Sequence, residues 1–144
     1  GFSYNKFADS ITVSETEWDF ERYKPDIIVI NLGTNDMNYA TTDERKAEFE
    51  DGYLDFLKKV RSLNPDSYIF QTYGVMGTSL EENIENVRRK YMSETGDERI
   101  TFIPLTMQDE DADGIVADWH PSPRTHSLVS QKVTAAIKKT LGYK

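Results

Sequence analysis

Two short polar segments carry side chains that could perform hydrogen-bond and acid–base chemistry. GTND contains Asn35, whose amide, at the end of a strand, could donate a hydrogen bond to a developing oxyanion. DWHPSP contains His120 two residues after Asp118, and a carboxylate can hold an imidazole in one tautomer. Both segments also have plainer interpretations, namely a simple turn for GTND and a surface histidine beside a loop-capping aspartate for DWHPSP.

The residues after His120 predict the start of a helix. Ser122 suits the N-cap position and Pro123 the first helical position. The positive end of a helix favours a neutral imidazole, which is what a general base needs near pH 7. The second histidine, His126, lies about one turn into this helix, and we interpret it as structural or exposed.

Strands and helices alternate along the rest of the chain. Apolar runs predict parallel strands at 26–32, 67–73 and 99–105, the first of them buried on both faces. Helical spacing predicts helices at 43–63, 80–93 and 123–141. The βαβαβα order predicts an α/β fold, an open parallel sheet with helices on both faces.

Helix ends and loops refine this expectation. Thr41 with Glu44 and Ser79 with Glu82 form two expected capping boxes, and Gly96 and Gly142 are expected to end helices. In open parallel sheets, ligands bind at the carboxyl ends of the strands. Any active site is therefore expected in three loops that share this edge: 33–42, 74–79 and 106–121.

Composition narrows the function classes. A chain of 144 residues fits a single domain, and its net charge of -8 argues against nucleic acid and anionic membranes as partners. The absence of cysteine excludes disulfides, zinc–thiolate sites and cysteine nucleophiles. The longest apolar run, IIVI, is far too short to span a bilayer. No phosphate-binding loop or dinucleotide fingerprint occurs, so we expect no cofactor.

Several segments together resemble a known family. KPDIIVINLGTND and DWHPSPRTH resemble the third and last sequence blocks of the SGNH (GDSL-type) hydrolases, in particular the acetyl esterases of carbohydrate esterase family 2. TEWDFERYKPD and GDERITFIP are similar as well, so the resemblance runs from about Trp18 to the C-terminus. It implies a flavodoxin-like SGNH hydrolase fold, with residues 1–144 as the C-terminal portion of one esterase domain.

The resemblance also implies roles for five residues. Asn35 matches the oxyanion-hole asparagine, with Gly33 fixing its loop. His120 matches the catalytic base and Asp118 its acidic partner, although some members rely on a Ser-His dyad steadied by backbone carbonyls. Trp119 matches an aromatic residue that faces the bound sugar. The implied reaction is deacetylation of xylan or a related plant polysaccharide through an acyl-enzyme, without a metal, at a secreted or cell-surface location.

The nucleophile is the missing part of this pattern. KFADSIT offers Ser10, but only 24 residues separate it from Asn35. A βαβ unit alone needs about 30 residues, so the intervening blocks of the family cannot fit. Ala8 stands where the family has glycine, and the residues before it are polar. We therefore interpret Ser10 as part of a loop or short strand, and expect the serine on a missing N-terminal segment and this chain alone to be inactive.

The strand at 26–32 supports the same expectation. In a flavodoxin-like order it pairs with the absent first strand, and an apolar strand with an open edge invites pairing. We expect a separate N-terminal segment or a second copy of the chain to cover this edge.

Two other functions remain open at this point. A fragment with Trp119 but no serine could be a non-catalytic carbohydrate-binding fragment. Alternatively, DEDADG places Asp109, Asp111 and Asp113 at the spacing of an EF-hand calcium loop. His120 then stands where that loop has a bidentate glutamate, and the segment follows a strand, so a solvated acidic loop is the plainer interpretation.

Overall fold

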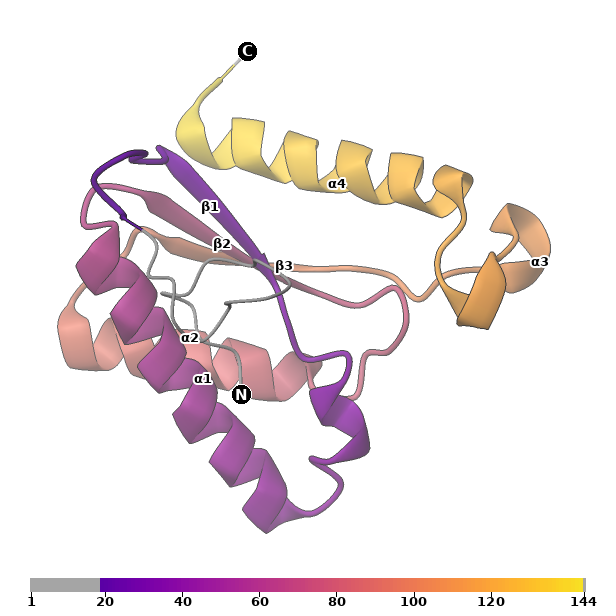
Figure 1. The fold of residues 1–144 in the computed structure, drawn as a ribbon, viewed down its shortest axis with the longest axis horizontal. Coiled ribbons are helices and arrows are strands. Elements are labelled where there is room, and N and C mark those ends of the chain that lie inside the picture. Colours follow the sequence, from indigo (N-terminus) through magenta and orange to yellow (C-terminus); the bar gives the residue numbers. More distant parts are fainter. Residues whose placement is uncertain (1–18, 144) are drawn as a thin grey trace.

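The computed structural model describes residues 19–143 and contains one parallel sheet. Its strands are β1 (Ile27–Asn31), β2 (Tyr68–Tyr73) and β3 (Ile100–Pro104), in the order β1-β2-β3. All three carboxyl ends point to the same side (Figure 1). Ser10 and Trp18 lie outside the described residues, so the interpretation of Ser10 stays a prediction.

Helices cover both faces of this sheet, which confirms the expected α/β fold. The helices α1 (Asp43–Leu63) and α2 (Glu81–Thr95) lie on one face, and α4 (Pro123–Leu141) lies on the other (Figure 1). The loops beyond the carboxyl ends hold three shorter helices: η1 (Asp36–Asn38), α3 (Glu110–Asp113) and η2 (Ala117–Trp119). Within residues 19–143, no helix is long and apolar enough to cross a membrane.

The two faces are packed unequally. Leu57, Val60 and Ile84 are completely buried between α1, α2 and the sheet. Each such side chain contributes about 1.5–3 kcal/mol through burial. On the other face, α4 presents partly buried side chains such as Val133 to Phe70, and its one buried residue is Thr125. The core of the described chain therefore lies mainly on the α1–α2 face.

Helix ends follow the predictions only in part. Ser122 caps α4 by accepting a hydrogen bond from the Thr125 N–H at 3.2 Å, and left-handed glycines end α2 and α4, as predicted. Both expected capping boxes are wrong. Thr42 caps α1, and Thr41 lies in the turn before the helix, where its N–H donates to the Tyr39 carbonyl at 2.9 Å. At α2, the N-cap is Leu80, and a backbone bond from Glu81 to Thr78 replaces the side-chain cap.

β1 is an edge strand, and it is more exposed than the sequence predicted. Among residues 19–143 it pairs with β2 alone. Ile30 is its one buried residue, and Val29 is 48% exposed on the α4 side of the sheet. The prediction of burial on both faces is therefore wrong: Ile27 packs in the apolar cluster on the α4 side, but Val29 on the same face stays half-exposed.

Candidate active site

The first loop at the carboxyl edge depends on a glycine. Gly33 is buried with φ of +119°, and a Cβ there would lie 3.1 Å from the Tyr73 ring. The Gly33 carbonyl accepts a hydrogen bond from the Met37 N–H at 3.0 Å, which closes a tight turn. Asn35, inside this turn, is exposed, and its side chain makes no capping hydrogen bond. Its amide is therefore available at the end of β1.

Close contacts join the first loop to the second. The Tyr73 hydroxyl donates to the Met37 sulfur at 3.7 Å. A side chain at Gly77 would overlap that same sulfur, so Gly77 lies directly against Met37. The second loop also packs against the third. Gly74 has φ of +135° and lies against the Leu105 backbone, and the Leu105 N–H donates to the Tyr73 carbonyl at 2.7 Å. The three loops therefore share one edge, as predicted.

The third loop ends in a narrow hairpin that carries the DWH residues. Its stem is closed by a bridge between Ile115 and Pro121 and by a hydrogen bond from the Val116 N–H to the His120 carbonyl at 3.0 Å. At its tip, Asp118 (φ 53°) and Trp119 (φ 62°) adopt left-handed conformations. This region costs a residue with a side chain roughly 1–2 kcal/mol.

Such conformations are concentrated in the loops of this edge. Val75, in the second loop, has φ of 72°, and it completes the set of positive-φ residues other than glycine that the described chain contains. Residues in sparsely populated backbone regions tend to cluster at functional sites, where the surrounding structure holds them in place.

The His120 ring contacts a backbone carbonyl. Its Nδ1 lies 3.1 Å from the Ala117 carbonyl oxygen. Because a carbonyl can only accept, this hydrogen bond requires the proton on Nδ1 and leaves the Nε2 lone pair free. The exposed Asp118 carboxylate makes no hydrogen bond or ion pair with any residue in the range 19–143. The sequence indicated Asp118 as the partner of the ring, but the atom that contacts Nδ1 belongs to Ala117.

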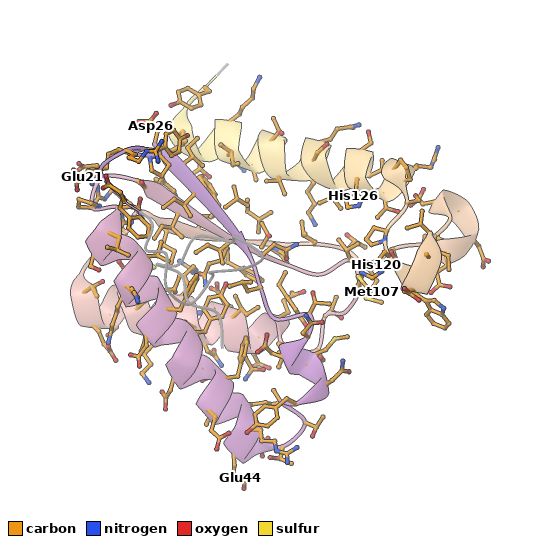
Figure 2. All side chains as sticks on the ribbon, viewed as in Figure 1. Glu21, Asp26, Glu44, Met107, His120 and His126 are labelled. Atoms are coloured by element: carbon orange, nitrogen blue, oxygen red, sulfur yellow. The ribbon has the colours of Figure 1, made fainter. Side chains whose placement is uncertain are left out.

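The structure places the predicted site residues on two flanks of the same edge. Gly33 and Asn35 follow β1, whereas Asp118, Trp119 and His120 belong to the loop after β3. Adjacent strands are about 4.8 Å apart, so the ends of β1 and β3 are separated by roughly 10 Å. Figure 2 shows His120 beyond the carboxyl ends of the strands, and Asp26 at the opposite end of the sheet.

His126 and Trp119 are both exposed. Trp119 is 67% exposed at the hairpin tip, so its ring is open to solvent. His126 is exposed in the first turn of α4, in agreement with its interpretation as a structural or exposed residue. His126 belongs to α4 and not to the hairpin that carries His120, so it provides an internal reference for experiments on the His120 ring.

A cavity of about 380 Å³ lies beside the first loop. Asp36 and Tyr39 line it from the loop, and Tyr53 and Phe56 line it from α1. Burial raises the pKa of Tyr53 to about 12. The Tyr53 hydroxyl is therefore neutral at physiological pH and does not serve as a base.

The acidic segment 109–114 stabilises the third loop through local bonds. Asp109 caps α3 by accepting a hydrogen bond from the Ala112 N–H at 2.9 Å. The Asp113 carboxylate pairs with Arg124 at 2.6 Å, and the Asp113 carbonyl accepts from the Ser122 hydroxyl at 2.6 Å. Within the part of the chain that the structure describes, no group of three or more His, Cys, Asp or Glu residues could hold a metal ion. The geometry therefore gives the calcium alternative no support.

One polar residue of this edge was not found from the sequence. The Gln108 side chain donates from Nε2 to the Trp119 carbonyl at 2.8 Å, and its backbone N–H donates to the Val75 carbonyl at 2.9 Å. A single glutamine in a long loop belongs to no recognisable motif, so no sequence signal pointed to it.

The sequence profile of the GDSL-like Lipase/Acylhydrolase family matches residues 8–128. The chain belongs to this family. The recognition of an SGNH (GDSL-type) hydrolase is thereby confirmed.

Curated relatives of this GDSL-family chain are carbohydrate-active enzymes. It is 35% identical to the cellulase/esterase CelE of Acetivibrio thermocellus, over 96% of this chain and 17% of CelE. It is 22% identical to an acetylxylan esterase / glucomannan deacetylase of Cellvibrio japonicus, over 97% of this chain and 38% of that enzyme. The chain thus spans well under half the length of either relative.

Solved structures give the same picture. The acetyl xylan esterase Est2A of Butyrivibrio proteoclasticus matches with a TM-score of 0.81 and 27% identity, over 91% of this chain and 40% of that one. A family two carbohydrate esterase of Clostridium thermocellum, in complex with cellohexaose, matches with a TM-score of 0.80 and 37% identity, over 91% of this chain and 41% of that one. The fold is therefore that of the SGNH carbohydrate esterases, over about two fifths of their length.

Proposed function

We propose that this chain supplies the general base and an oxyanion donor of a carbohydrate acetyl esterase. In this proposal His120 is the base, Asn35 donates to the oxyanion, and Gly33 sets the turn that carries Asn35. The observation that carries the proposal is the His120 ring, whose Nδ1 is bound to the Ala117 carbonyl and whose Nε2 lone pair is left free. The exposed Asn35 amide lies at the same edge of the sheet.

The chemistry follows from these roles. Nε2 of His120 removes the proton from a serine hydroxyl as the serine oxygen attacks the acetyl carbonyl carbon. The Asn35 amide donates a hydrogen bond to the carbonyl oxygen as it becomes negative. The imidazolium then returns the proton to the departing sugar oxygen, which leaves an acetyl-serine. Water, activated by the same ring, releases acetate and restores the serine.

The Ala117 carbonyl is suited to this cycle because it accepts the Nδ1 hydrogen from the neutral and the protonated ring alike. Asp118, which the resemblance implies as the acidic partner, lies one residue further along the same tip. As an exposed carboxylate it would attract the imidazolium through solvent, so we assign it a smaller role than that of the carbonyl.

The serine, in this proposal, belongs to an N-terminal segment that pairs with the free edge of β1. Residues 1–144 are then the C-terminal portion of one esterase domain. Support comes from the half-exposed Val29 and from the cavity that Leu32 and Phe56 line beside β1. The match to about two fifths of Est2A is in accord with it. A second copy of the chain is the other candidate for covering this edge.

The proposed substrate is an acetylated polysaccharide or oligosaccharide such as xylan, met in a secreted or cell-surface setting. Trp119 offers an aromatic face that is 67% exposed on a constrained tip, which suits stacking against a sugar ring. The cellohexaose complex of the Clostridium thermocellum esterase supports this choice of ligand class. No cofactor is part of the proposal.

The proposal is tested by acetate release from 4-nitrophenyl acetate. The chain would be assayed alone, as the Ser10→Ala variant, and together with a segment that carries a Gly-Asp-Ser block. We expect activity only with the segment, and a loss of about 100- to 1,000-fold when Asn35→Ala removes the oxyanion donor. Activity of the chain alone that disappears in Ser10→Ala would contradict the proposal.

A non-catalytic carbohydrate-binding role is the second candidate, because Trp119 could hold a sugar without a serine. Retention on insoluble xylan or cellulose by the chain, measured against Trp119→Ala, separates the two functions. Retention that depends on Trp119, with no acetate release in any combination, would favour the binding role.

A further inference from the structure

The hairpin 115–121 has a well-fixed stem and a constrained tip. Its stem is held by the Ile115–Pro121 bridge, and Ser122 ties the following helix start to the Asp113 carbonyl. Its tip holds Asp118 and Trp119 in left-handed conformations, which residues with side chains adopt only when other contacts hold them. The contact that holds the tip therefore controls the geometry of His120.

That contact comes from Gln108. Its Nε2 donates to the Trp119 carbonyl at 2.8 Å. Within the described residues 19–143, this is the one hydrogen bond that joins the tip, residues 117–119, to a part of the chain outside the hairpin. The bonded carbonyl belongs to the peptide group between Trp119 and His120, so the bond fixes the plane of that peptide.

The same peptide group leads directly to the His120 ring. Its N–H, from His120, donates to the Ala117 carbonyl at 3.2 Å, and Nδ1 of the ring contacts that carbonyl at 3.1 Å. A rotation of the Trp119–His120 peptide would therefore disturb both bonds to Ala117. Holding the Trp119 carbonyl keeps Nδ1 on its acceptor and Nε2 free.

Gln108 is itself anchored on the second loop. Its backbone N–H donates at 2.9 Å to the carbonyl of Val75, the residue with a φ of 72°. Val75 follows Gly74, whose backbone lies against Leu105. Backbone contacts at Gly74 and Val75, followed by the Gln108 side chain, thus connect the end of β2 to the hairpin tip.

The other end of the Gln108 amide indicates why a glutamine is present. Its Oε1 is buried and has no hydrogen-bond partner among the described residues. A buried amide with an unpaired oxygen is less favourable than an apolar side chain of similar shape, unless the donor half is needed. The donor half is the one that bonds to Trp119.

We propose that Gln108 is a positioning residue that holds the Trp119–His120 peptide and so fixes the orientation and tautomer of the His120 ring. The structural part of this inference concerns the ring alone, and its catalytic consequence rests on the proposed esterase function.

The test is ¹⁵N NMR of the two histidine rings at about pH 8.5, where an ordinary imidazole is neutral. In the unaltered chain, His120 is expected to carry its proton on Nδ1, while the exposed His126 shows the tautomer mixture of a free ring. Gln108→Glu keeps the shape of the side chain but cannot donate to the Trp119 carbonyl. In this variant we expect the ¹⁵N signals of the His120 ring to show the same tautomer mixture as those of His126.

Gln131→Leu is the matched control, since it removes a glutamine of α4 whose side chain donates to the Ser127 hydroxyl on the same helix. It is expected to leave both rings unchanged. Gln108→Leu provides a second variant of Gln108, and backbone amide spectra establish that each variant is folded. An unchanged Nδ1 tautomer of His120 in a folded Gln108 variant would overturn the proposal.

In an esterase completed by the serine-bearing segment, Gln108→Glu is expected to lower kcat for 4-nitrophenyl acetate by about 10- to 100-fold with little change in KM. A loss of tautomer order without any loss of kcat would overturn the catalytic part. Failure of the proposed function itself would be recognised separately, because His120→Ala would then leave acetate release unchanged while the NMR result would stand.

Discussion

The two ends of the sheet are held together in different ways: the amino edge, where the strands begin, and the carboxyl edge, where they end. At the amino edge, the Arg61 guanidinium lies 2.7 Å from Asp97 and donates to backbone carbonyls of four residues: Asn64, Pro65, Ser67 and Arg99. The Tyr91 hydroxyl also donates to Asp97, at 2.8 Å. One side chain thus ties the end of α1 to the starts of β2 and β3.

In the described loops of the carboxyl edge, no single charged side chain joins several segments as Arg61 does at the amino edge. Glycines in close contact, such as Gly33 and Gly74, bring its loops together, and single hydrogen bonds hold strained residues in place. Asn35, Trp119 and His120 are all exposed there. A catalytic site needs polar side chains that are held in place by the backbone and are still free to contact a substrate. Polar groups that hydrogen-bond to one another, as at the amino edge, stabilise the fold instead.

The strongest test of this contrast compares one glycine from each edge. Gly74→Ala would place a methyl group against the Leu105 carbonyl at a φ of +135°, so we expect a loss of about 3–4 kcal/mol in the free energy of unfolding. Gly96→Ala, at φ +69° with open space around it, should lose only about 1 kcal/mol. Urea denaturation measures both, and equal losses would contradict the close packing of the carboxyl edge.

Arg61→Ala tests the amino edge. It removes the closer of the two guanidinium groups that pair with Asp97, leaving Arg99 at 3.3 Å, and it takes away donors from several backbone carbonyls. We therefore expect a loss of about 3 kcal/mol in unfolding free energy. Lys58→Met, which removes the exposed pair with Glu94, is the control and should change stability by less than about 1 kcal/mol. A small effect of Arg61→Ala would show that the network does not hold this edge.

Acidification should also weaken the amino edge. Burial alone would raise the pKa of Asp97, but hydrogen bonds from Arg99 and Tyr91 and the charge of Arg61 outweigh it, and the net pKa is lowered. A carboxyl group with a lowered folded pKa stabilises the fold fully above its unfolded pKa, near 3.9, and loses that stabilisation as pH falls further. Asp97→Asn should therefore flatten the acid limb of a stability–pH curve, and an unchanged limb would contradict this.

The smallest expected effect is that of Asp118→Asn at the carboxyl edge. Because the Ala117 carbonyl contacts Nδ1 of His120, loss of the exposed Asp118 charge should lower kcat/KM of the completed esterase by less than about fivefold, since exposed pairs are worth about 1 kcal/mol or less. A loss of a thousandfold or more would restore Asp118 as the main partner of the ring.

The amino-acid sequence predicted most of the framework because side-chain patterns determine it. The apolar spacing of α1 gave its bounds at Asp43 and Leu63, and Ser122, Pro123 and Gly142 gave those of α4. These signals are local, so they can be interpreted without knowing the tertiary structure.

Other features depend on contacts that side-chain letters do not reveal. The capping boxes were wrong because backbone turns determined where α1 and α2 begin. The exposure of Val29 depends on which elements cover β1. The bond between His120 and Ala117 involves a backbone carbonyl, and that from Gln108 joins residues 11 positions apart, so neither has a sequence signature.

The central claim is that the carboxyl edge holds the base of an esterase, and a pair of histidine variants tests it most directly. The measurement is kcat/KM for acetate release by the chain completed with a serine-bearing segment. His120→Ala is predicted to lower it by roughly a thousandfold or more, and His126→Ala to leave it unchanged. Losses of similar size in the two variants, or a loss below about tenfold in His120→Ala, would contradict the account.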